Sequence, residues 1–218
     1  ATVRSVASKT NYTGLDGTGI GIAFLDSGVM RNHLAFNDVN WTSRVRRNVT
    51  MLSTSIANWT VANGTTTSLQ PNSSAMWAYE NAVANDSSQN HDPFGHGTHV
   101  ASVAAGDPRF YTYAGETTGI APNADIYDVR VLDDNGNGTL SDAIEGVEWV
   151  IYHAKEYNIR VLNISLATDS SDSWELDPLC IAARSAVAAG ITVVAAAGNY
   201  GKDANGKEVY GAIGAPGN

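Results

Sequence analysis

The feature of this sequence that most constrains its fold is an alternation of short apolar runs with segments of helical periodicity. Four short apolar runs, each bounded by turn-forming residues, are predicted to be buried strands: residues 20–25, 125–131, 160–166 and 191–196. Three segments have the spacing or start and stop signals of helices: residues 96–105, 141–157 and 178–189. This order predicts an α/β fold with a mostly parallel sheet and helices on both faces.

Residues 37–94 interrupt the alternation. They are polar and rich in Asn, Ser and Thr, and three tryptophans, Trp41, Trp59 and Trp77, are scattered through them. Because tryptophan side chains give such a segment something to bury, we expect a long surface insertion with some order of its own.

Composition excludes several classes of function. The 218 residues suit one domain, and 22 Asp and Glu against 13 Lys and Arg give a net charge of −9. Nucleic acids and anionic membranes require basic surfaces, so neither is expected as a partner. No apolar stretch approaches the roughly 18 residues of a membrane span. The one cysteine excludes an internal disulfide framework.

Ligands of parallel α/β sheets bind beyond the carboxyl ends of the strands, and Asp26 directly follows the first predicted strand. In Leu25-Asp26-Ser27-Gly28 this carboxylate either caps a turn or orients another side chain.

Residues 91–99 read His-Asp-Pro-Phe-Gly-His-Gly-Thr-His, with glycines on both sides of His96. One interpretation is a metal cluster of His91, Asp92, His96 and His99, although no Cys or Glu joins it. The other is that the open imidazole of His96 acts as a general base beside a carboxylate, with His99 structural.

The ends of the later strands also carry candidate binding residues. Asn199 follows a run of small residues and is suited to donate its amide to an oxyanion, although Gly-Asn also forms ordinary turns. The segment Asn163-Ile164-Ser165-Leu166-Ala167 offers a backbone edge to an extended peptide, with the turn Gly136-Asn137-Gly138 on the other side.

In this order, these motifs resemble the subtilisin-like serine proteases, the subtilase family. Five segments carry the resemblance: Asp26-Ser27-Gly28, His96-Gly97-Thr98-His99-Val100-Ala101, Gly119-Ile120-Ala121-Pro122-Asn123-Ala124, Asn163-Ile164-Ser165-Leu166 and Ala196-Ala197-Gly198-Asn199. The resemblance covers roughly residues 14–36 and 91–218, and it implies a three-layer fold and peptide hydrolysis through a Ser/His/Asp triad.

The resemblance also implies a role for each matching residue. His96 is the general base, Asp26 orients it, and Asn199 binds the oxyanion. It implies no cofactor for the chemistry and a peptide or protein as substrate. The residues implied to bind that substrate are Gly136, Asn137, Gly138, Ser165, Leu166, Ala167, Ala196, Ala197 and Gly198.

The match fails at the nucleophile. The family carries its serine in a Gly-Thr-Ser type motif, and none of the 21 glycines here is followed two residues later by serine. We therefore expect residues 1–218 to be the amino-terminal part of one catalytic domain, incomplete and inactive alone. A complementary carboxy-terminal segment or second chain would carry the serine. The alternative is a non-catalytic, truncated subtilase fold that binds peptides or is an inactive fragment.

Three smaller expectations follow from the same comparison of motifs. Ala35 stands where many members of the family have a calcium-ligating aspartate, so a structural calcium there is in doubt. Ala167 replaces a usual glycine, which should narrow or reshape the main specificity pocket. Proteases of this family are usually secreted, and the absence of paired cysteines and the acidic balance fit an extracellular protein. A nucleotide site at Gly17-Thr18-Gly19-Ile20-Gly21 is disfavoured because these glycines precede the strand.

Overall fold

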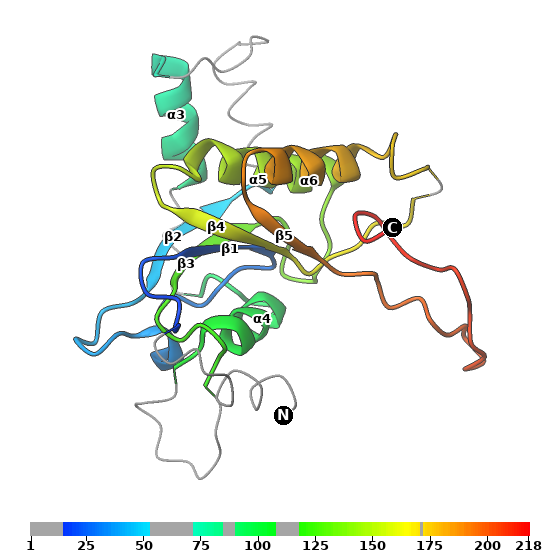
Figure 1. The fold of residues 1–218 in the computed structure, drawn as a ribbon, viewed down its shortest axis with the longest axis horizontal. Helices are drawn as coiled ribbons and strands as arrows, with labels where there is room; N and C mark the ends of the chain where they lie inside the picture. Colours follow the sequence, from blue (N-terminus) through cyan, green and yellow to red (C-terminus); the bar gives the residue numbers. More distant parts are fainter. Residues whose placement is uncertain (1–14, 53–71, 85–89, 108–117, 171) are drawn as a thin grey trace.

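The computed structural model describes residues 15–52, 72–84, 90–107, 118–170 and 172–218. Five parallel strands form one sheet in the order β2-β3-β1-β4-β5 (Figure 1). The strands are β1 (Gly21–Asp26), β2 (Val45–Thr50), β3 (Asp125–Arg130), β4 (Ile159–Ile164) and β5 (Thr192–Ala195). The helices are η1 (Leu34–Phe36), α3 (Ser74–Val83), α4 (His96–Ala105), α5 (Leu140–His153) and α6 (Pro178–Ala188).

The helices cover both faces of the sheet, which confirms the predicted three-layer α/β fold. Helix α4 packs on one face, and α5 and α6 lie on the other, where α3 also lies beyond α5 (Figure 1). The central strand β1 is buried along its whole length, as expected of a strand with both faces covered. Its Phe24 joins the core on the α4 side, and its Leu25 joins the core on the α5 and α6 side.

Local sequence explains where the helices begin and end. Thr139 accepts a hydrogen bond from the backbone N–H of Asp142 and so caps the start of α5. The predicted helix runs to residue 157, but α5 ends at His153 with Ala154 as its cap. A turn follows and leads into β4. In this turn Asn158 has a left-handed φ of 49°, and its carbonyl accepts from the N–H of Gly21, the first residue of β1.

The predicted insertion at 37–94 is wrong in its first part, because residues 45–50 form β2 and pair with β3 at the edge of the sheet. The strand was not predicted because two consecutive arginines, Arg46 and Arg47, interrupt its apolar pattern. Helix α3 gives the insertion the internal order expected of it, whereas residues 53–71 and 85–89 lie outside the described residues.

Two further features concern nucleotide binding and membrane insertion. The glycine turn at 17–21 leads into a strand, with the N–H of Ile20 bonded to the carbonyl of Gly17, so it presents no helix amino terminus to a phosphate. None of the helices in the described part of the chain has the length and apolar character needed to cross a bilayer.

Candidate active site

The site begins with a contact between Asp26 and His96. Asp26 is the last residue of β1 and is fully buried, and His96 is the first residue of α4 with a side chain 44% exposed. The Nδ1 atom of His96 lies 2.7 Å from Oδ1 of Asp26. When Asp26 is ionised, the proton of the ring is held on Nδ1, and Nε2 is left as a free base toward solvent.

The electrostatics of Asp26 combine two opposing effects. Burial raises the pKa of this carboxyl, and the hydrogen bonds that it accepts from His96 and from the backbone N–H of Ser27 oppose that rise. Its second oxygen, Oδ2, is buried without a hydrogen-bond partner among the described residues. The carboxylate is therefore directed at His96 and depends on that contact for part of its stabilisation.

Glycines around His96 permit this approach. Gly95 has a φ of +89°, which favours glycine, and turns the chain into α4. A Cβ atom on Gly97 would lie 2.1 Å from the carbonyl oxygen of Gly28. The amino terminus of α4 therefore contacts the backbone that follows β1 directly, which brings the imidazole of His96 onto Asp26.

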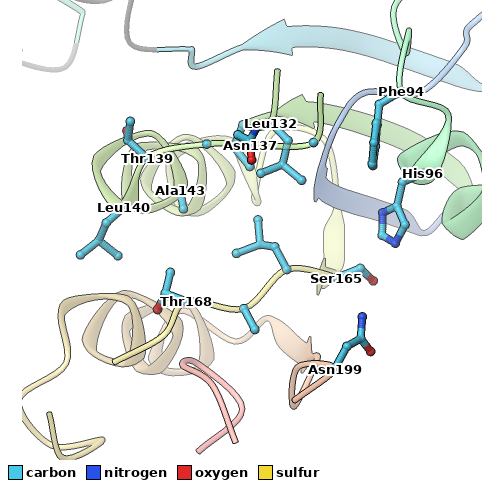
Figure 2. Close-up of a pocket in the computed structure, with 15 residues that line it drawn as sticks. Phe94, His96, Leu132, Asn137, Thr139, Leu140, Ala143, Ser165, Thr168 and Asn199 are labelled. Carbon is cyan, nitrogen blue, oxygen red and sulfur yellow. The ribbon is translucent and has the colours of Figure 1, made fainter. Parts of the chain in front are cut away.

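His96 opens into a pocket of about 490 Å³ at the carboxyl ends of the strands (Figure 2). Asn199, which follows β5, lies on its border near Ser165, and His96 lies on the other side of Ser165. The lining residues are Phe94, His96, Val131, Leu132, Gly136, Asn137, Gly138, Thr139, Leu140, Ala143, Ser165, Leu166, Ala167, Thr168 and Asn199.

Eight of the residues singled out from the sequence thus line one pocket. The turn at Gly136–Gly138 and the segment Ser165–Ala167 lie on opposite sides of it, as expected for two edges that flank an extended peptide. Asp26 lies behind His96 and does not reach the pocket itself. Ala167 lines the pocket next to Leu166 and Thr168.

Three residues assigned to substrate binding, Ala196, Ala197 and Gly198, do not line this pocket. Their backbone is engaged elsewhere: the N–H of Ala196 donates to the carbonyl of Ile164, and the carbonyl of Ala197 accepts from the N–H of Gly214. They lead from β5 to Asn199, and their assignment to substrate binding stays a prediction.

Sequence reasoning missed several lining residues. Phe94 borders the pocket, and the centroid of its ring lies 6.4 Å from the centroid of the His96 ring. A Cβ atom on Gly136 would lie 2.6 Å from the nearest atom of the Phe94 ring. Thr139, Leu140 and Ala143 reach the pocket from the first turns of α5. Their places in the sequence could have predicted this, because Phe94 lies two residues before His96 and Thr139 directly follows the glycine turn.

The metal interpretation of residues 91–99 finds no support in the described part of the chain, which contains no group of three His, Cys, Asp or Glu side chains arranged to hold an ion. Asp92 is buried and accepts hydrogen bonds from protein donors.

The backbone around Ala35 is engaged by protein donors. Its carbonyl oxygen accepts from Nη2 of Arg44 and from the N–H of Asp107. The same guanidinium donates to the carbonyls of Ala105 and Ala124. The side chain of Ala35 has no oxygen that could ligate a calcium ion.

The parallel sheet with its Asp–His contact, and an asparagine across the adjoining pocket, define a subtilisin-like α/β domain. A sequence model of the Subtilase family matches residues 17–218, and the chain belongs to this family.

Individual relatives agree with this assignment. The chain is 39% identical over 126 residues to serine protease AprX of Bacillus subtilis, an alignment that covers 56% of this chain and 28% of the relative. It is 42% identical over 118 residues to subtilisin DY of Bacillus licheniformis, covering 52% of this chain and 37% of that protein. The chain thus spans about a third of the length of these relatives.

Solved structures show the same fold. The CspB protease of Clostridium perfringens superposes with a TM-score of 0.66 at 22% identity, over 92% of this chain and 42% of that one. Sphericase superposes with a TM-score of 0.63 at 27% identity, over 99% of this chain and 56% of that one.

Proposed function

We propose that this chain supplies the acid–base pair and the oxyanion donor of a serine endopeptidase. The observation that carries the proposal is the 2.7 Å contact of His96 with Asp26, on the border of a pocket that Asn199 also lines. Membership of the subtilase family supports it. The nucleophilic serine comes from outside these 218 residues, on a further segment or a second chain, because the sequence contains no glycine followed two positions later by serine.

The chemistry follows from the orientation of the imidazole. Nδ1 of His96 is held by Asp26, so Nε2 accepts the proton of the serine hydroxyl as that oxygen attacks the scissile carbonyl. The serine oxygen bonds to the carbonyl carbon, and the carbonyl electrons move to its oxygen. Asp26 stabilises the imidazolium that forms. The carbonyl then re-forms as the carbon–nitrogen bond breaks, and Nε2 gives its proton to the leaving amine. Water attacks the acyl-enzyme in the same way, and the serine oxygen leaves with the proton that Nε2 took from the water.

Asn199 stabilises the tetrahedral intermediate. It borders the pocket on the side of Ser165 opposite His96, so its side-chain amide faces the region where a carbonyl oxygen would develop negative charge (Figure 2). One such donor contributes about 3–4 kcal/mol to the transition state in enzymes of this kind.

The substrate is an extended peptide. It lies between Gly136–Gly138 and Ser165–Ala167 and adds its backbone to these edges as a strand would. The methyl group of Ala167 favours a small or apolar side chain before the scissile bond. We place the protein outside the cell. The family resemblance favours this location, and the absence of paired cysteines is compatible with it.

A serine-directed fluorophosphonate probe tests this function. The 218-residue chain and any longer polypeptide that carries it are treated with the probe, and the labelled peptide is identified by mass spectrometry. We expect label on a serine outside residues 1–218, together with hydrolysis of peptides, and no label on the 218-residue chain alone. Label on a serine within the chain contradicts the external nucleophile, and no labelling or hydrolysis in any folded form supports a non-catalytic peptide-binding module.

A further inference from the structure

A second buried carboxylate, that of Asp92, lies four residues before His96. Asp92 is 3% exposed and accepts three hydrogen bonds. Its Oδ1 accepts from Oγ of Ser27 and from the N–H of Gly95, each at 2.8 Å, and its Oδ2 accepts from the N–H of Thr98 at 2.8 Å.

These bonds replace a conventional helix cap. The residue that precedes α4 is Gly95, which has no side chain to satisfy the first amides of the helix. The N–H of Gly97 instead donates to Oγ of Ser27 at 3.0 Å, and that of Thr98 donates to Asp92. The first turn of α4 is therefore capped by one residue that follows β1 and by another that precedes the helix, and these two are bonded to each other.

The consequence for the Asp–His pair is geometric. Ser27 directly follows Asp26, and its hydroxyl both donates to Asp92 and accepts from Gly97, the residue after His96. Displacement of Ser27 or of the helix start would therefore change the distance between Asp26 and His96. A further bond, from the N–H of Met30 to Oγ1 of Thr98, ties the same two segments.

We propose that Asp92 is the positioning residue of the Asp26–His96 pair, acting through Ser27 and the first amides of α4. The inference rests on the proposed function, in that it assigns Asp92 to the site where His96 is the base. Asp92 does not touch the substrate. It fixes the imidazole against Asp26, and its negative charge at the amino terminus of α4 is favourable to the helix dipole.

Asp92→Asn keeps the shape of the side chain and removes its charge. The bonds from Ser27, Gly95 and Thr98 then lose a charged acceptor, so the link between the two segments loosens. Asp128 is another buried carboxyl, and its pKa is raised well above the usual value, first by its own burial and further by the charge of Asp92. It is left unchanged in every variant.

The test compares three variants, Asp92→Asn, Ser27→Ala and Asp177→Asn. Asp177 is the matched control, because it is also a buried aspartate that caps a helix: it accepts from the N–H groups of Leu179 and Cys180 at the start of α6. The contact between His96 and Asp26 is followed by NMR, as the chemical shift of the proton on Nδ1 of His96 in the folded protein, and stability is measured by thermal unfolding.

We expect Asp92→Asn and Ser27→Ala to shift the resonance of that Nδ1 proton upfield or to broaden it by exchange with water, because the contact with Asp26 loosens. Asp177→Asn should lower the melting temperature comparably and leave this resonance unchanged. If Asp92→Asn and Ser27→Ala lower only the melting temperature, Asp92 is a helix cap and the proposal is wrong. The NMR measurement requires no catalysis, so a failure of the proteolytic function would be seen separately, as an absence of peptide hydrolysis in the unmodified protein.

Discussion

His96 Nδ1 and Asp26 Oδ1 are 2.7 Å apart, although 70 positions of sequence separate the two residues. The contact exists because β1 ends at the buried carboxylate and α4 begins at the imidazole, and because Gly28 and Gly97 let the two backbones touch. A histidine held in this way has one tautomer and one free nitrogen. That property distinguishes a general base from a surface histidine.

The first prediction concerns Asp26. Replacing it by Asn keeps the shape of the side chain, removes the negative charge and puts an N–H donor in place of one carboxylate oxygen, so that the tautomer of His96 is no longer fixed. We expect Asp26→Asn to lower kcat for peptide hydrolysis by about 10⁴-fold with little change in KM. Steady-state kinetics on the serine-containing protein measure this, and a loss of less than tenfold would show that Asp26 does not orient the base.

The second prediction separates Asn199 from its neighbour in the pocket. Asn199→Ala removes the proposed oxyanion donor, so kcat should fall by about 10² to 10³-fold. Ser165→Ala is the matched control. It lines the same pocket, but its hydroxyl is bonded to Nδ2 of Asn163, and we expect less than a tenfold change. Abolished hydrolysis in Ser165→Ala would instead indicate that Ser165 is the nucleophile.

The third prediction concerns the pH dependence of the contact between α3 and α5. His153 lies between two carboxylates, with Nε2 3.0 Å from Glu80 on α3 and Nδ1 3.0 Å from Glu156. Burial opposes the charged form of the ring, but the bonds to Glu80 and Glu156 outweigh it and raise the pKa of His153. A raised folded-state pKa stabilises the protein fully below the unfolded value of about 6.5, and this stabilisation is lost as pH rises through the folded value.

Urea unfolding at several pH values measures that effect. We expect the difference in free energy of unfolding between the unmodified protein and His153→Gln to be largest below about pH 6.5, at about 1–3 kcal/mol, and to shrink as pH rises. A difference in free energy of unfolding that stays constant over this pH range would mean that the charge of His153 does not stabilise the contact between α3 and α5.

The fourth prediction concerns Arg44. Its buried guanidinium donates to three carbonyls, those of Ala35, Ala105 and Ala124, which belong to three separate segments. We expect Arg44→Met to lower the free energy of unfolding by about 3–5 kcal/mol, because it removes the guanidinium donors of the Ala105 and Ala124 carbonyls and leaves that of Ala35 with only the N–H of Asp107.

Arg46→Met is the control for Arg44→Met. It removes a partly exposed ion pair with Asp125 and should cost less than about 1 kcal/mol. Chemical unfolding with circular dichroism measures both changes. Similar costs for the two variants would contradict the role given to Arg44.

The sequence was sufficient for the parts of the fold in which local pattern and tertiary environment agree. The bounds predicted for α4, 96–105, match His96–Ala105, because glycines mark its start and end. The turn after β3 was also predictable. Asp133 accepts from the N–H groups of Asn135 and Asn137, and Gly136 takes the positive φ that such a loop requires.

Other parts depend on contacts that no local pattern carries. Strand β2 contains two arginines and an asparagine, and its place in the sheet comes from pairing with β3. The same limit applies to the site. Asp26, His96 and Asn199 stand out by motif, whereas the link from Asp92 through Ser27 joins residues 65 positions apart and becomes visible only in three dimensions.

The measurement that tests the central claim most directly is the rate of peptide hydrolysis by the serine-containing protein with His96 replaced by Ala, alongside His99→Ala one helical turn further on. The account predicts that His96→Ala lowers kcat by at least about 10⁴-fold and that His99→Ala changes it by less than tenfold. Retention of hydrolysis in His96→Ala, or equal losses in the two variants, would contradict the assignment of His96 as the base.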